Sequence, residues 1–174
     1  FYSDAMEDLS NFAIKHNIPV TQTVMGYSTM KRDHSHFLGP IGGLGGKAAN
    51  NLAKQTDLAI AVGTKLADFT TGSWANFENP DFSLVSVNVS RFDASKHLAQ
   101  SVIGDAKVSL QELSNALGDW KAPDEWHKKS RDELKNWNDY VDKESGPTNQ
   151  ELPSYAHAVG AIYRNSDPTD IAVT

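Results

Sequence analysis

Hydrophobic residues near the beginning of the chain recur at the spacing of an amphipathic helix. The residues that set this period are Met6, Leu9, Phe12 and Ala13. They predict a helix over residues 3–16 that packs on a parallel sheet through these side chains. Ser3 or Asp4 is the expected N-cap, and Asp4 and Glu7 have the spacing of a capping pair. Asn17 can end the helix.

Apolar runs bounded by turn residues predict the strands. Residues 18–24 form a run that is entered through Pro19, which is tolerated at the start of a strand. Residues 57–62, DLAIAV, are nearly continuously apolar, which is typical of a parallel strand covered on both faces. Further strands are expected over residues 82–89 and 101–103.

A glycine-rich turn lies between two of these strands. Five glycines fall between residues 39 and 46, after a predicted loop over residues 26–40. They allow a sharp turn into a helix that begins at Leu44 or Gly45 and ends at Gln55. The order of turn, helix and apolar strand is the half-unit of a doubly wound α/β domain, in which ligands bind at the carboxyl ends of the strands. A later helix over residues 108–117 is closed by Gly118.

The composition changes after Trp120. Residues 123–145 are rich in Lys, Asp and Glu, and their apolar residues fall close to one stripe, which predicts a long, partly solvated helix. Residues 146–153, GPTNQELP, break that helix and are typical of a linker. A helix over 154–164 and a strand over 171–174 are expected to follow.

We therefore predict an α/β fold with a doubly wound parallel sheet in residues 1–120, followed by a helical linker over residues 121–152. The first helix has no strand before it, and the last strand has no helix after it. The chain is thus expected to be a fragment of a longer protein. A strand should precede the first helix, and its absence would leave an open slot between the two strands that flank it in the sheet.

Composition excludes several classes of function. The net charge of −6 argues against binding of nucleic-acid phosphates, which requires a basic face. The chain has no cysteine, which excludes disulfides, thiolate metal sites and a cysteine nucleophile and fits a cytoplasmic protein. No apolar run approaches the roughly 20 residues of a membrane span.

Two loops are candidates for contact with a ligand. The candidate residues are Gly45, Gly46, Thr64, Lys65, Asp68, Thr70, Thr71 and Ser73. The glycine-rich turn could hold an anion, but GGLGGK lacks the G-x-G-x-x-G spacing, and Asp68 follows a polar loop rather than a strand end. Lys47 does not have the spacing of a P-loop lysine. Tight packing of strand against helix and a retained ligand pocket both stay open.

Histidines offer little chemistry in the sequence. His34 and His36 lie two residues apart beside Asp33, a spacing that could chelate a metal ion. One short loop supplies too few ligands, so we expect a solvated loop. The remaining histidines, which receive no role, are His16, His97, His127 and His157. No catalytic and no metal-binding residue is assigned.

The segment GPIGGLGGKAANNLAKQTDLAIAVGTKLADFTTGSWANF resembles the central domain of thiamine diphosphate-dependent enzymes. The motif DFTTGSW is similar to the acylhydrolase branch of inositol catabolism, and NVSRFDASKH, VIGDAK and LGDWKAPDEW follow in the order of that branch. ELPSYAHAVGAIYRNSDPTDIAVT resembles the entry to a C-terminal diphosphate-binding domain, over residues 153–174. The resemblance implies a Rossmann-like central domain.

The resemblance also implies a function for the parent protein, which is hydrolytic C–C cleavage that opens a cyclic diketone derived from inositol. It implies thiamine diphosphate and Mg²⁺ in the parent enzyme, two flanking domains as partners and a homo-oligomer. This chain has no Gly-Asp-Gly motif, so we expect no cofactor and no activity in the fragment itself. The alternatives are a fragment of an acetolactate synthase-like enzyme and a stand-alone nucleotide-binding α/β module.

Overall fold

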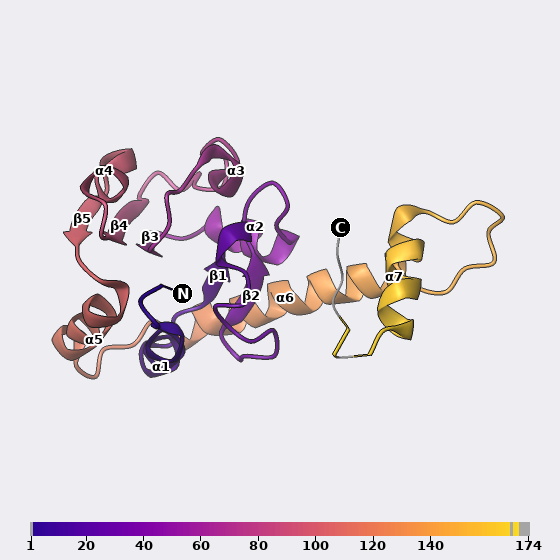
Figure 1. Ribbon diagram of the computed structural model, residues 1–174, viewed down its shortest axis with the longest axis horizontal. Helices are drawn as coiled ribbons and strands as arrows, with labels where there is room; N and C mark the ends of the chain where they lie inside the picture. Colours follow the sequence, from indigo (N-terminus) through magenta and orange to yellow (C-terminus); the bar gives the residue numbers. More distant parts are fainter. Residues whose placement is uncertain (1, 168, 171–174) are drawn as a thin grey trace. The chain divides into compact units, whose positions relative to one another are not determined.

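A computed structural model describes residues 2–167 and 169–170 (Figure 1). The chain divides into two compact units, residues 1–134 and 135–174. The helices of the first unit are α1 (Met6–His16), α2 (Lys47–Ala53), α3 (Asp68–Thr71), α4 (Arg91–Ala94), α5 (Ala106–Leu117) and the first part of α6 (Asp124–Glu144), with short 3₁₀ turns η1 (Val24–Gly26) and η2 (Lys96–Leu98). The second unit contains the rest of α6 and α7 (Tyr155–Asn165).

The strands of the first unit form two parallel sheets. Their bounds are β1 (Val20–Gln22), β2 (Phe37–Pro40), β3 (Leu58–Val62), β4 (Ser83–Asn88) and β5 (Gln100–Ile103). β1 pairs with β2, and the second sheet has the order β3-β4-β5, with Val62 opposite Val87. Parallel strands with helices between them confirm the predicted α/β class.

Helix α1 supplies the core that joins these sheets. Phe12 packs in a cluster with Leu110 of α5, and Ile60 of β3 lies against that cluster. Ala13, one residue further, packs with Phe37 of β2. The expected packing of Met6 is wrong, because its side chain is 37% exposed. The helix begins only at Met6, so this residue lies in its first turn rather than over the sheet.

Several local predictions are also wrong. The predicted loop over residues 26–40 ends in β2, a strand whose sequence FLGP has no alternation and which forms because its pairing with β1 buries Leu38. Neither Ser3 nor Asp4 caps α1: the N-cap is Ala5, with no side-chain hydrogen bond, because Asp4 has a left-handed backbone. Asp105 caps α5, which therefore begins before the predicted start.

Strand β3 is less covered than its apolar sequence predicts. Of its residues only Ala61 is buried, and Leu58 at its beginning is 49% exposed. The expectation that both faces are covered is therefore wrong in this chain. β3 has a partner strand on one side only among the described residues, and this leaves part of its surface accessible.

The predicted elements beyond Trp120 agree better with the structure. The long helix expected over residues 123–145 is α6, and Ser154 caps α7 through a hydrogen bond from the His157 amide. Figure 1 draws α6 in orange and α7 in yellow. The strand predicted over residues 171–174 lies outside the described residues. Within them, no helix is long and apolar enough to span a bilayer.

Candidate functional site

The loops that follow β3 and β4 meet at the carboxyl edge of the three-stranded sheet. The Asn88 side chain, at the end of β4, donates a hydrogen bond from Nδ2 to the carbonyl of Thr64, 3.1 Å away. The His97 ring lies on the Trp74 ring with 4.2 Å between their centroids. Because the strands are parallel, their carboxyl ends share one edge, which is where open α/β sheets place ligands.

The glycine-rich turn is fastened to the same loops. The Gly43 amide donates to the carbonyl of Phe69, 2.8 Å away, in helix α3. The Asn50 side chain bonds both backbone groups of Gly42, accepting from its amide at 2.9 Å and donating to its carbonyl at 3.1 Å. Asn76 donates in turn to Asn50 Oδ1. The structure therefore brings together the two candidate loops, which lie about 20 residues apart in the sequence.

Within these loops the candidate side chains divide into buried and exposed groups. Thr71 is buried, and its hydroxyl oxygen accepts a hydrogen bond from the Trp74 amide at 3.2 Å. Thr64 accepts through Oγ1 from the Leu66 amide. Thr70 is half-buried, whereas the exposed candidates are Lys65, Asp68 and Ser73. The exposed group offers one ammonium, one carboxylate and one hydroxyl at the sheet edge.

The amides of the glycine-rich turn are engaged inside the protein. Gly45 donates to the carbonyl of Gly42, and Gly46 donates to the carbonyl of Pro40, both at 2.9 Å. Among the described residues, no group of three His, Asp or Glu side chains could hold a metal ion. This part of the chain therefore does not fit the diphosphate and divalent ion of the implied cofactor.

Apolar side chains and strained backbone gather at this edge. The exposed hydrophobic residues of the turn and loops are Leu44, Phe69, Val89, Phe92 and Leu98. Five residues without a glycine's freedom have positive φ there, and these are Leu66, Ser73, Trp74, His97 and Leu98. Such conformations cost about 1–3 kcal/mol each and persist only where the surroundings impose them. The edge is therefore a fixed surface on which exposed apolar side chains stand beside the polar side chains of Lys65, Asp68 and Ser73.

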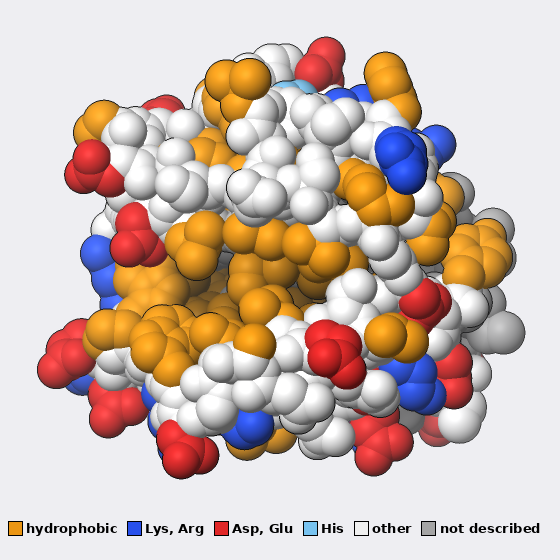
Figure 2. Space-filling view, turned by 90° about the vertical axis from the view of Figure 1, so that its left-hand side faces the viewer, with side chains coloured by type: hydrophobic (Ala, Val, Ile, Leu, Met, Phe, Trp, Pro, Cys, Tyr) orange, Lys and Arg blue, Asp and Glu red, His pale blue; other side chains and the backbone are white. Residues whose placement is uncertain are grey.

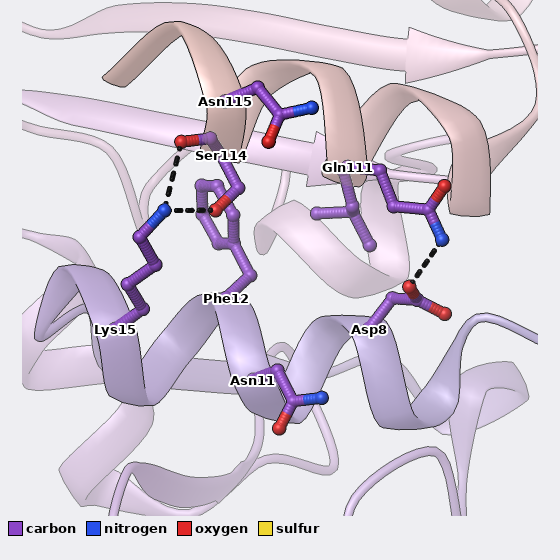
Figure 3. Close-up of a pocket in the computed structure, with 8 residues that line it drawn as sticks. Asp8, Asn11, Phe12, Lys15, Gln111, Ser114 and Asn115 are labelled. Carbon is purple, nitrogen blue, oxygen red and sulfur yellow. Dashed lines mark hydrogen bonds between the residues drawn. The ribbon is translucent and has the colours of Figure 1, made fainter. Parts of the chain in front are cut away.

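Two other surfaces offer less chemistry. Figure 2 shows the side of the first unit that carries α4, β5 and α5, with hydrophobic side chains gathered around a hollow. A groove of about 330 Å³ lies between α1 and α5. Figure 3 shows that hydrogen bonds from Gln111 to Asp8 and from Lys15 to Ser114 bridge it. These bridges connect the two helices directly, so the groove is a packing feature.

The histidines depart most from expectation. The prediction of a solvated loop is wrong for His36, which is 7% exposed. His16 is fully buried: its Nδ1 donates to the carbonyl of Trp120 at 2.7 Å, and its Nε2 lies 3.0 Å from the Ser114 hydroxyl. No spacing in the sequence indicates these contacts, because the partners lie about 100 residues away.

Comparison with known proteins adds to this geometry. The family described as thiamine pyrophosphate enzyme, central domain, matches residues 1–113. A 3D-(3,5/4)-trihydroxycyclohexane-1,2-dione hydrolase of Clostridium perfringens is 48% identical over 116 residues, which cover 67% of this chain and 18% of that protein. A protein of the same name from Geobacillus thermodenitrificans is 36% identical over 171 residues, covering 92% of this chain and 26% of its own length.

The chain therefore spans only about a fifth to a quarter of the length of these relatives. The matched residues contain both sheets and the loops at their carboxyl edge. This chain belongs to the family of thiamine pyrophosphate enzyme central domains.

Proposed function

We propose that this chain is the central-domain part of a thiamine diphosphate-dependent hydrolase that opens the ring of a trihydroxycyclohexane-1,2-dione by C–C cleavage, in the catabolism of myo-inositol. The observation that carries the proposal is the likeness to the Geobacillus thermodenitrificans hydrolase, because it extends over 92% of this chain. It thus includes residues on both sides of the boundary between the two units.

The central domain has a supporting role in this proposal. Thiamine diphosphate and Mg²⁺ are held by other parts of the parent protein, since this chain has no Gly-Asp-Gly motif and its glycine-rich turn uses its own amides. Residues 121–152 serve as a helical linker and residues 153–174 begin the diphosphate-binding domain. The parent is a cytoplasmic homo-oligomer.

The carboxyl edge is the part of the domain that meets its neighbours in the parent protein. Lys65, Asp68 and Ser73 are exposed there beside Phe69, and the loop is held in place by Asn88. A rigid, partly apolar edge suits packing against a second domain and contact with the substrate channel. The shape of this edge is maintained by Gly45 and Gly46 and by Thr64, Thr70 and Thr71.

A chimera tests the proposal. The corresponding segment of the Clostridium perfringens hydrolase is replaced by the matched part of this chain, and dione consumption is measured with and without thiamine diphosphate and Mg²⁺. We expect the chimera to hydrolyse the dione and the 174-residue chain alone to show neither turnover nor micromolar cofactor binding by calorimetry. A folded chimera without activity, or tight cofactor binding by the isolated chain, would contradict the proposal.

A further inference from the structure

Three histidines meet where residues 34–37 contact the first half of α6. The rings of His36 and His127 are stacked, with 4.3 Å between centroids and an interplanar angle of 30°. The His34 ring lies 5.9 Å from that of His36. We call His34, His36 and His127, together with Arg131, the histidine cluster. All its members belong to the first compact unit.

Helix α6 is attached to this segment by side chains that carry or can carry a positive charge. The Arg131 guanidinium donates to the carbonyl of Ser35 at 3.0 Å and to that of Phe37 at 3.3 Å. His127 Nε2 lies 3.2 Å from the same carbonyl of Ser35. These three contacts position the two side chains close to the His36 ring.

His36 has both ring nitrogens satisfied in its neutral form. The amide of Asn17 donates through Nδ2 to Ala122 and Asp124, so its Oδ1 faces His36 and accepts from Nε2 at 3.3 Å. The other nitrogen, Nδ1, then accepts from the Ser35 hydroxyl at 2.9 Å. A second proton on the ring would require Ser35 to reverse its role and would add a charge.

The titratable and charged groups around His36 oppose that charge. From α6 they are His127 and Arg131, and from its own segment His34; the carboxylate of Asp124 reaches it only through Asn17. Asp33, immediately before that segment, is the nearest acidic neighbour in sequence. Burial, then His127, His34 and Arg131, lower the pKa of His36 from 6.5 to about 4.

We propose that the histidine cluster is an acid-sensitive contact, in which protonation of His36 loosens the attachment of the first half of α6 to residues 34–37. The buried ring, the stacked His127 and the shared carbonyl of Ser35 place the charge of the bound proton directly against α6. A buried histidine between cationic groups is the usual element of such switches.

The direction of the pH effect follows from the lowered pKa of His36. The attached state favours the neutral ring, so its stabilisation is fully present above pH 6.5 and is lost as the pH falls toward 4. Within that window, each fall of one pH unit lowers the equilibrium constant for attachment of α6 by up to about tenfold. Between pH 7.5 and 5.5 we expect a loss of roughly tenfold.

Amide hydrogen exchange, corrected for the intrinsic rate at each pH, tests the proposal in the 174-residue chain. The amides of residues 127–134 should lose roughly tenfold in protection between pH 7.5 and 5.5. The variant His36→Gln cannot be protonated and should remove this dependence. His157→Gln, in the cap of α7 in the other unit, is the matched control and should retain it.

A second measurement needs no variant and so does not depend on the folding of His36→Gln. The imidazole resonances of the wild-type chain should show His36 titrating well below pH 6. Titration of His36 near pH 6.5, protection that does not change with pH, or an equal pH dependence in His36→Gln would each overturn the proposal.

Discussion

At the scale of single residues, Gly42 is the most constrained position of the candidate site. Its φ is +104°, and a Cβ built there would lie 2.3 Å from the carbonyl oxygen of Phe69. Both of its backbone groups are bonded by Asn50. The position therefore requires glycine for its conformation and for the close approach of α3.

We expect Gly42→Ala to destabilise the chain by about 2–4 kcal/mol, because the cost of the positive φ is added to the cost of overlap between the new Cβ and the α3 backbone. Gly43→Ala is the matched control: its Cβ would meet Phe69 only at 3.6 Å, and its φ is not positive. Urea denaturation of both variants provides the measurement. Equal midpoints would show that the turn does not depend on contact with α3.

At the scale of elements, the outer edges of β1 and β3 are the most unusual feature. The backbone groups of Val20 and Gln22 form hydrogen bonds on the side of β2, so the backbone groups of Thr21 point to the opposite edge of the strand. The backbone groups of Asp57 and Gly63 form hydrogen bonds on the side of β4. Because successive residues of a strand point to alternate edges, the backbone groups of Ile60 and Val62 point to the outer edge. No strand pairs with either outer edge among the described residues.

These outer edges lie close to the packed core of the first unit. α1 packs on β3 through Phe12 and on β2 through Ala13, so it lies across both sheets. Gln22 is 7% exposed, and its Oε1 has no hydrogen-bond partner among the described atoms. An unpaired strand edge either takes up water or recruits another strand.

Amide hydrogen exchange in β3 distinguishes an outer edge that is open to water from one that is paired with another strand. In this chain we expect the amides of Ile60 and Val62 to exchange roughly tenfold or more faster than those of Ala59 and Ala61, which face β4. The alternate residues serve as internal controls for burial and fraying. Equal protection of all four amides, measured by NMR, would mean that another strand occupies the outer edge.

At the scale of the whole molecule, the chain consists of two compact units that α6 connects by sequence. Between α6 and α7, most of residues 146–153 are exposed, and the Gln150 amide donates a local hydrogen bond to the Thr148 hydroxyl. Glu151 lies in this segment. Glu78, in an exposed loop of the first unit, forms an ion pair with Lys54 at 2.9 Å.

Limited proteolysis with a glutamate-specific protease should therefore cut first after Glu151. We expect this cleavage to be roughly tenfold faster than cleavage after Glu133 or Glu144, which lie in α6, because the protease requires an extended backbone. Mass spectrometry of early time points identifies the order. Initial cleavage within α6 would show that the helix opens before the segment that follows it.

The helical parts of this protein could be predicted from sequence because their signals are local. The amphipathic period set by Leu9 and Phe12, the cap at Ser154 and the charged stripe of α6 each act within one or two turns. The motif around DFTTGSW was likewise sufficient to indicate the family. These features depend on residues that are neighbours in the chain.

Only the tertiary structure decided the remaining features. β2 forms in a predicted loop because β1 offers it a partner, and His36 is buried because residues 17, 35 and 127 surround it. Gly42 is fixed by Phe69, which lies 27 positions later in the sequence and belongs to another loop. Strand pairing, histidine burial and loop contact are determined by residues far apart in sequence, whose proximity no local pattern encodes.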